Sequence, residues 1–285
     1  MFQATINSSV FVKGIGVHTG NEFSVTLYPS EEGSGIVFVR RDKPNVENKI
    51  IADFRNVSDT TMCTALSNQF GLKIFTIEHL MAALYGLGIT NVLVETSGAE
   101  IPILDGSAIQ WIEAISKVGV KQQSAKIKII KILKEVRVEE ENRWVSFSPA
   151  ENFSVNVECD FKNRGLETLP VFYDSNKDDF VKFFSKARTF GFVTDIEYLR
   201  KQNIAKGASL ENTVVFDAQG YPLINAPLRY QDEPVRHKVL DAVGDLYLSG
   251  GRLIGKYESY CPGHKMNNLI LRKLFENSEN YEIVI

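Results

Sequence analysis

The sequence predicts an α+β protein built from two related halves. Strand-like and helix-like patterns are mixed along the chain without a regular strand–helix–strand alternation, which favours helices layered on antiparallel sheets. A chain of 285 residues also suggests about two domains from the usual size of a domain. An internal echo supports this division, because residues 25–31 (VTLYPSE) align without gaps to residues 145–151 (VSFSPAE).

A second pair of blocks repeats the pattern of a helix. His79 opens an apolar helical pattern with Gly86 seven residues later, and His237 does the same with Gly244. The first echo is offset by 120 residues (25 to 145) and the second by 158 (79 to 237), so the second half would carry an insertion of roughly 38 residues. Short matches also arise by chance, and these blocks alone do not separate a duplication from a coincidence.

The first half, residues 1–123, reads as strands followed by helices. We expect strands within 4–40, a helix over 76–85, a strand over 91–96 and a helix over 108–118. Ser107 can cap the second helix, and glycines follow both helices. The polar stretch 121–126 is expected to be a linker.

The second half, residues 124–285, mixes the two patterns in the same way. We expect strands over 127–138, around Val145 and Val155, and over 213–216 and 253–257, with helices over 177–186, 194–202 and 233–248. The helix over 194–202 has an acidic start and a basic end, as the helix dipole favours. Residues 262–264 (Pro-Gly-His) are expected to form a loop.

Composition excludes several classes of protein. The chain has 32 Lys and Arg against 35 Asp and Glu, a net charge of −3, which argues against nucleic-acid partners. Three distant cysteines without a C-x-x-C pair disfavour a disulfide framework and fit a reducing cytosol. The N-terminal residues lack a signal-peptide pattern, and the longest uncharged run near the middle, about 15 residues, is too short to span a bilayer. We therefore expect a cytoplasmic protein, or one resting on a membrane, without a transmembrane segment.

The four histidines are the first candidates for chemistry. His237 and Asp241, four residues apart on one helix face, could chelate one Zn²⁺, although an exposed helical ion pair is the commoner meaning of this spacing. If the halves face each other, His79 could supply a third ligand and leave the open fourth position of a catalytic site. Glu78 would then be a base beside the metal. The alternative is a core histidine at position 79 and an ordinary first-turn acid at position 78.

Two further histidines lie in glycine-containing segments. His264 follows a predicted strand, where catalytic groups often lie, although a loop histidine is usually only a surface residue. His18 lies within 14–20, whose spacing fits neither the P-loop nor the dinucleotide fingerprint, so a turn between strands is favoured. The aromatic run Phe180, Phe183 and Phe184 is more typical of a core than of a ligand cage.

Seven blocks of sequence fall in a recognisable order. They are TIEHL (76–80), GLGI (86–89), IPILDGSA (101–108), ARTFGF (187–192), VRHK (235–238), LDAVGDL (240–246) and GHKMNN (263–268). Together they resemble the UDP-3-O-acyl-N-acetylglucosamine deacetylase family of lipid A biosynthesis in Gram-negative bacteria, over essentially the whole chain. The resemblance implies two similar α+β domains, each of paired helices packed on a mainly antiparallel sheet (a β-α-α-β sandwich), with the active site between them.

The resemblance also implies roles for individual residues, carried over by motif position. His79, His237 and Asp241 would bind one catalytic Zn²⁺, and ferrous iron is an alternative because both metals accept imidazole and carboxylate ligands. The other catalytic roles are Glu78 as general base, His264 as general acid, Thr189 stabilising the oxyanion, and Lys238 and Asp245 supporting the site. The acyl-binding insertion would span about residues 187–216. Substrate contacts would come from Asp160 and Phe161 (uracil and ribose), Phe190, Phe192 and Ile196 (acyl chain), and His18 (pocket lining).

The implied reaction is zinc-dependent hydrolysis of the N-acetyl group of UDP-3-O-(3-hydroxyacyl)-N-acetylglucosamine, with release of acetate. A base at Glu78 and an acid at His264 predict a bell-shaped pH–rate curve, with His264 on the alkaline limb. We expect a monomer that acts on this acylated UDP-sugar and contacts the inner membrane transiently. The rivals are a zinc amidase for another acetylated substrate and a non-catalytic zinc protein. The insertion argues against the first rival, and the joint presence of Glu78 and His264 argues against the second.

Overall fold

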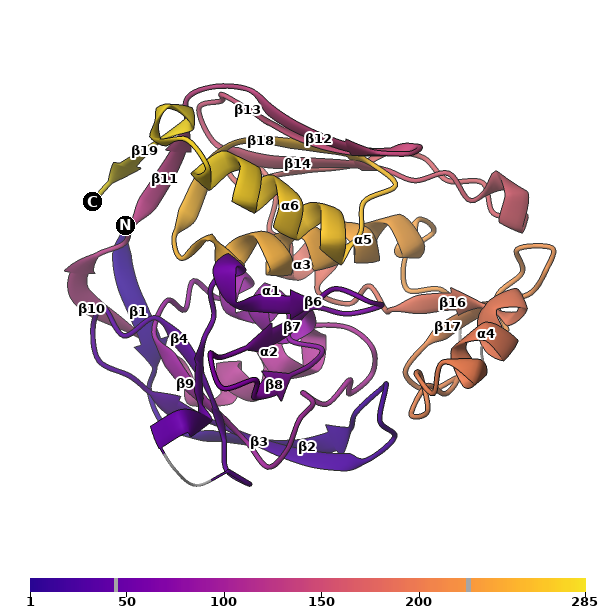
Figure 1. Ribbon diagram of the computed structural model, residues 1–285, viewed down its shortest axis with the longest axis horizontal. Helices are drawn as coiled ribbons and strands as arrows, with labels where there is room; N and C mark the ends of the chain where they lie inside the picture. The colour runs from indigo at the N-terminus through magenta and orange to yellow at the C-terminus, as the bar shows by residue number, and fades with distance from the viewer. Residues whose placement is uncertain (44–45, 224–226) are drawn as a thin grey trace.

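The molecule is built in four layers. A computed structural model describes residues 1–43, 46–223 and 227–285. Figure 1 shows a sheet at each outer face and two pairs of helices between the sheets. This arrangement, with mainly antiparallel sheets, confirms the predicted α+β class. We call residues 1–126 the first lobe and residues 127–285 the second lobe.

The first lobe is centred on a five-stranded sheet covered on one face by helices. Its strands, in spatial order, are β2 (Val10–Ile15), β3 (Glu22–Pro29), β9 (Val92–Thr96), β4 (Ile36–Arg40) and β5 (Lys49–Ile51). All neighbours are antiparallel except β4 and β9. Along β9, Val92 and Val94 are buried while Leu93 and Glu95 are half-buried, the alternation of a one-sided strand. The helices are α1 (Glu78–Gly86) and α2 (Ile109–Val118).

The second lobe repeats this sheet with the same strand order and the same directions. Its strands are β12 (Val136–Glu140), β13 (Arg143–Ser148), β18 (Arg252–Tyr260), β14 (Phe153–Glu158) and β15 (Val171–Asp174). Among these five strands only one pair, β14 and β18, is parallel. Strand β11 (Ile129–Ile132) adds a second parallel pairing to β18. The helices α5 (Glu233–Leu246) and α6 (His264–Phe275) take the places of α1 and α2. The echoed blocks begin on the matching strands β3 and β13, so the topology favours a duplication over coincidence.

Smaller elements complete the two lobes. They are β1 (Phe2–Ile6) paired with β10 (Val120–Lys126), the sheet of β6 (Val57–Asp59), β7 (Ala65–Ser67) and β8 (Lys73–Ile74), the strands β11 (Ile129–Ile132) and β19 (Tyr281–Val284), and helix α3 (Phe180–Phe184). The region 187–216 holds β16 (Phe190–Phe192), α4 (Ile196–Lys201) and β17 (Val214–Phe216). This region projects from one end of the layers (Figure 1).

Two local expectations differ from the structure. The stretch 121–126, expected to be a linker, belongs to strand β10, which pairs antiparallel with β1. Its polar composition reflects exposure, because only Gln123 and Ala125 of these residues are even half-buried. The expected boundary at 123/124 therefore falls inside a strand, and the division into two domains stays a prediction. His264 lies at the first position of α6 rather than in a loop, with Gly263 preceding the helix in an extended conformation.

The lobes meet where α1 packs against α5. A Cβ atom at Gly244 would lie 2.2 Å from the carbonyl oxygen of Glu78 and 3.1 Å from the backbone nitrogen of Ala82. Only glycine permits so close an approach of two backbones. This contact brings the first turn of α1 against the last turn of α5.

Both ends of the chain lie against the segment that connects the lobes. Ile127 donates a backbone hydrogen bond to the carbonyl of Met1 (3.2 Å), and Ile129 pairs with Val284 in adjacent strands. Figure 1 shows the two termini side by side at this position. In the described part of the chain, no helix is both long enough and apolar enough to span a membrane.

Candidate active site

Three buried side chains from both lobes converge beside the α1–α5 contact. His79 comes from α1, and His237 and Asp241 come from α5. The Nε2 atoms of His79 and His237 lie 3.5 and 3.3 Å from the same carboxylate oxygen, Oδ1 of Asp241. The two imidazole rings are nearly perpendicular, with centroids 4.9 Å apart. The three potential ligand atoms all lie within 4.8 Å of one another, which suits a single metal ion.

The chemistry of this cluster fits a divalent cation. Oδ1 of Asp241 is buried and has no hydrogen-bond partner among the described residues, which is costly for a carboxylate oxygen unless a cation satisfies it. Nδ1 of His237 lies 3.0 Å from the carbonyl of Ala187, a bond that places the proton on Nδ1 and leaves the Nε2 lone pair toward the cluster. Burial lowers the pKa of His237 to about 3, so the ring stays neutral as a metal ligand must. Two imidazoles and one carboxylate are a donor set of catalytic zinc sites.

Lys238 supports this cluster from the next position on α5. Its Nζ donates to Oδ2 of Asp241 at 2.8 Å, which leaves Oδ1 directed at the histidines. Burial opposes the charge of Lys238, but the Asp241 carboxylate outweighs burial and raises the lysine pKa. For Asp241, burial is likewise opposed by His237 and Lys238, and its pKa is held well below the usual range. The carboxylate is therefore ionised at neutral pH.

Glu78 lies next to the cluster, at the first position of α1. Its side chain is buried, and Oε2 accepts a hydrogen bond from the backbone nitrogen of Thr64 at 3.0 Å. Burial raises the pKa of Glu78, while the nearby charges of His264 and His79 partly oppose that shift. A carboxylate with a raised pKa can accept a proton near neutral pH, as a general base must.

His264, at the start of α6, is paired with Asp245 of α5. Nδ1 of His264 lies 2.8 Å from Oδ2 of Asp245. Burial alone would lower the pKa of His264, but the carboxylate of Asp245 outweighs burial and raises it to about 9. The ring is therefore protonated at neutral pH, and its Nε2 proton is available for donation. Glu78 and His264 each shift the pKa of the other, so the two groups lie close enough for their electrostatic interaction to matter.

Comparison with known proteins identifies the family. The family model for LpxC, described as UDP-3-O-acyl N-acetylglycosamine deacetylase, matches residues 3–276. The chain belongs to the LpxC family. Curated relatives named UDP-3-O-acyl-N-acetylglucosamine deacetylase, from Shewanella sp. strain ANA-3, Shewanella baltica strain OS155 and Shewanella oneidensis, are each 44% identical to it. Each alignment covers 100% of this chain and 93% of the relative. Family membership confirms the resemblance inferred from the seven sequence blocks.

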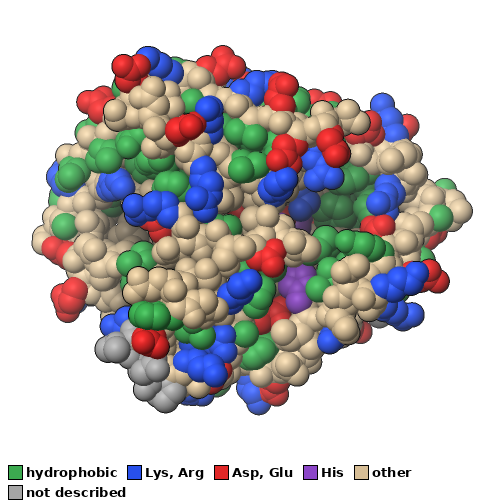
Figure 2. Space-filling model, in the orientation of Figure 1, with side chains coloured by type: hydrophobic (Ala, Val, Ile, Leu, Met, Phe, Trp, Pro, Cys, Tyr) green, Lys and Arg blue, Asp and Glu red, His purple; other side chains and the backbone are tan. Residues whose placement is uncertain are grey.

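An aromatic cluster adjoins the candidate metal ligands in this LpxC chain. Phe190 on β16 meets the His237 ring edge-on with centroids 6.3 Å apart, and the Lys238 ammonium lies 5.7 Å from the Phe190 ring centroid. Phe161 and Phe192 contact Phe190 at 5.5 and 6.1 Å between centroids. The structure thus brings together three of the five residues predicted to contact uridine or acyl chain. Figure 2 shows hydrophobic side chains in a hollow on this face, with histidine nearby.

The other predicted site residues in this region do not belong to the aromatic cluster. Ile196, the first residue of α4, is half-buried and lies outside the aromatic cluster as the structure describes it. Asp160 is exposed, and its Oδ2 accepts a hydrogen bond from the Tyr260 hydroxyl at 3.4 Å. The described contacts of Thr189 are backbone bonds, to Gly106 at 2.7 Å and from Val214 at 2.9 Å. The substrate contacts of Ile196 and Asp160 and the catalytic role of Thr189 stay predictions.

Sequence reasoning missed the residues that hold Asp245. Thr64 Oγ1 donates to Oδ1 of Asp245 at 2.5 Å, and Asn267 Nδ2 donates to Oδ2 at 2.8 Å. The Tyr257 hydroxyl in turn donates to Oδ1 of Asn267 at 2.6 Å. Asn267 lies inside the block 263–268 that marks the LpxC family, so the sequence offered a signal for it. Thr64 lies between two short strands, where no periodic pattern marks it.

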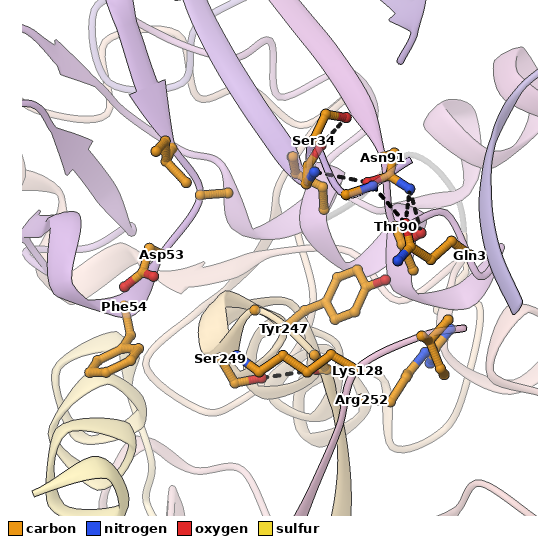
Figure 3. A pocket seen from close by; sticks show the side chains of 18 of the residues that line it. Gln3, Ser34, Asp53, Phe54, Thr90, Asn91, Lys128, Tyr247, Ser249 and Arg252 are labelled. Carbon is orange, nitrogen blue, oxygen red and sulfur yellow. Dashed lines mark hydrogen bonds between the residues drawn. The ribbon is translucent and has the colours of Figure 1, made fainter. Parts of the chain in front are cut away.

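A separate cavity of about 740 Å³ lies between the lobes near the termini. Figure 3 shows its polar side chains bonded to their own surroundings: Asn91 donates to Gln3 at 2.8 Å, and Ser249 donates to the carbonyl of Gly251 at 3.0 Å. None of the predicted site residues lines this cavity. This cavity is therefore separate from the histidine cluster.

Proposed function

We propose that this chain hydrolyses the N-acetyl group of UDP-3-O-(3-hydroxyacyl)-N-acetylglucosamine and releases acetate, an early committed step of lipid A biosynthesis. The observation that carries the proposal is one buried group of side chains where the lobes meet. It holds a two-imidazole, one-carboxylate cluster, a carboxylate with a raised pKa and an imidazolium paired with Asp245. The full-length match to relatives named for this deacetylation supports the choice of substrate.

We assign the metal to His79, His237 and Asp241, with Zn²⁺ as the expected ion and Fe²⁺ as the alternative. When bound there, such an ion would supply Lewis acidity toward the amide carbonyl and lower the pKa of a water molecule. Lys238 holds the Asp241 carboxylate in orientation through its 2.8 Å bond to Oδ2. The bond from His237 to the carbonyl of Ala187 fixes that ring in the same way.

The protein side chains move the two protons of the reaction. Glu78 accepts a proton from water as the water attacks the amide carbon. The amine leaves poorly as an anion, so Nε2 of His264 delivers a proton to the departing nitrogen while Nδ1 stays bonded to Asp245. We assign Thr189 to stabilising the developing oxyanion, a contribution that is often worth about 3 kcal/mol per donor.

The acyl chain of the substrate requires an apolar binding surface, and its uridine requires a nucleotide-binding surface. We assign the acyl chain to the insertion at 187–216, with Phe190, Phe192 and Ile196, and the uridine to Asp160 and Phe161. His18 would line the pocket between the acyl-chain contacts and the uridine contacts. The metal cluster is complete within one chain, which supports action as a monomer. An acylated substrate supports a cytoplasmic enzyme in transient contact with the inner membrane.

The test is an acetate-release assay on the acylated UDP-sugar, with the purified chain. Chelation should abolish acetate release, and Zn²⁺ or Fe²⁺ should restore it. Glu78→Gln and His264→Gln should each lower kcat by about 10²-fold or more while retaining bound metal. Lys265→Gln is the matched control, because Lys265 is exposed and its bond is a surface ion pair with Glu140. Full activity in either catalytic variant would remove that residue from the mechanism, and equal hydrolysis of non-acylated UDP-N-acetylglucosamine would contradict the lipid substrate.

A further inference from the structure

Glu100 carries a fully buried carboxylate for which the reaction above gives no role. Its Oε1 accepts a hydrogen bond from the backbone nitrogen of His18 at 2.7 Å. Its Oε2 accepts two bonds from Thr19, one from the backbone nitrogen at 2.9 Å and one from the hydroxyl at 2.6 Å. Gly16 lies so near that a Cβ there would be 2.3 Å from Oε2. The turn 16–19 is therefore wrapped around this one carboxylate.

The same carboxylate faces the segment that leads into α1. The Thr76 hydroxyl donates to Oε1 of Glu100 at 3.3 Å, and the backbone nitrogen of Phe75 donates to the carbonyl of Ala99 at 2.8 Å. Thr76 has a positive φ of 61°, an uncommon conformation for a β-branched residue that needs support from its surroundings. Glu100 thus joins the turn 16–19 to the residues directly before Glu78 and His79.

The other side of the turn is bonded to the insertion. The backbone nitrogen of Gly207 donates to the carbonyl of Val17 at 2.9 Å, and the backbone nitrogen of Lys206 donates to the carbonyl of His18 at 3.2 Å. A Cβ at Gly207 would lie 2.3 Å from the carbonyl oxygen of Gly16. The turn is therefore held between the buried carboxylate of the first lobe and the insertion of the second lobe.

The turn 16–19, held on both sides, carries the imidazole of His18. Both of its ring nitrogens are buried, and neither has a hydrogen-bond partner among the described residues. An unpartnered buried imidazole is costly, which is expected of a group that bonds to a ligand. Burial lowers the pKa of His18, and the electrostatic effect of His264 acts in the same direction.

We propose that Glu100 is a positioning residue, which holds the turn 16–19 so that the His18 imidazole hydrogen-bonds a polar group of the acylated UDP-sugar. The proposal rests on the proposed function for the identity of the substrate. It adds a residue that touches neither substrate nor metal and acts through His18.

A double-mutant cycle tests this coupling by kcat/KM in the acetate-release assay. Glu100→Gln keeps the shape of the side chain but places an NH₂ group against the N–H and O–H donors of the turn. We expect Glu100→Gln and His18→Ala each to lower kcat/KM by about 10- to 100-fold, with bound metal unchanged, and the double variant to lose no more than His18→Ala alone. Losses that multiply would overturn the proposal, because Glu100 would then act independently of His18.

A second readout is independent of activity. The ring C–H signals of the four histidines are measured by NMR, and the His18 signal is the one missing in His18→Ala. Glu100→Gln should shift this signal, whereas Glu95→Gln, a half-buried glutamate on β9, should not. Thr19→Val, which removes the hydroxyl donor to Oε2, provides a milder variant in case Glu100→Gln does not fold.

The two readouts separate the two hypotheses. A wild-type chain that releases no acetate contradicts the proposed function, yet the NMR comparison still decides whether Glu100 positions His18. An unshifted His18 signal in a folded Glu100→Gln or Thr19→Val variant overturns the positioning role, even if wild type is fully active.

Discussion

Asp245 sets the protonation of His264 although it lies outside the metal cluster. Its two oxygens accept hydrogen bonds from the Thr64 hydroxyl and the Asn267 amide and lie against the His264 ring, so the carboxylate is fixed in place beside that ring. Thr64 belongs to the first lobe, whereas Asn267 and His264 belong to α6. The acidity of one ring therefore depends on hydrogen bonds from both lobes.

Asp245→Asn should move the alkaline limb of the pH–rate curve to lower pH. The carboxylate raises the pKa of His264 to about 9 against the opposing effect of burial, and its loss leaves burial to lower that pKa. Loss of a neighbouring opposite charge typically shifts a pKa by about 1–3 units, so the limb should fall by at least about one unit. The measurement is kcat/KM against pH, with Lys265→Gln as control. A limb at the wild-type position in Asp245→Asn would show that another group titrates there.

At the level of single residues, the sequence could predict candidates but not their surroundings. The spacing of His237 and Asp241 placed both on one helix face, but the same spacing also fits a surface ion pair. Their burial and the approach of His79 from the other lobe follow from tertiary packing. The hydrogen bonds of Glu100 join residues about 80 positions apart in the chain, which no local pattern encodes.

Among the elements, the contact of α1 with α5 positions the ligands. His79 lies on one helix, and His237 and Asp241 lie on the other, so the spacing of the helices sets the distance between ligands. Gly244 defines that spacing, since its missing side chain leaves room for the Glu78 carbonyl.

Gly244→Ala should therefore destabilise the protein and weaken metal binding together. The new methyl would lie 2.2 Å from a backbone oxygen, and separating the helices should cost at least about 2 kcal/mol, more than the gain of about 1 kcal/mol in helix propensity. Urea unfolding and metal titration measure the two effects. Gly191→Ala, whose methyl meets open space, is the control for stability. Unchanged metal affinity in Gly244→Ala would show that the distance between α1 and α5 does not set the geometry of the proposed ligands.

The elements that could not be predicted from the sequence were missed for three different physical reasons. Helix α6 buries Met266, Ile270, Leu271 and Leu274, a helical spacing, but Pro262 and Gly263 before it are typical of a loop. Strand β10 is an edge strand with polar exposed side chains, so it resembles a linker. Strands β5 to β8 have only two or three residues, too few for a period to be visible.

For the whole molecule, metal binding and folding should be linked, because the ligands come from both lobes. A metal that binds only the folded chain stabilises it by about 2.7 kcal/mol at a concentration 100 times its Kd, a rise of about 5 °C in Tm for a chain of this size. Calorimetry with and without Zn²⁺ measures this rise, and His79→Ala should abolish it. A rise of equal size in His79→Ala would place the ion elsewhere.

The order of the strands within each sheet could not be predicted from the sequence. The echoes at 25–31 and 145–151 indicated two related halves, and both sheets do share one strand order. The parallel pairs β4–β9 and β14–β18, however, join strands far apart in the chain, whose neighbours are chosen by the packing of the helices between them.

The meeting of both chain ends on residues 127–129 has a practical consequence for engineering. A short peptide could bridge residue 285 to residue 1 and close the backbone into a ring. New ends could then be opened at Glu141, in the exposed tight turn between β12 and β13, without cutting either central helix. In such a circular permutant the first lobe would become an internal insert of the second, and every proposed ligand would keep its neighbours.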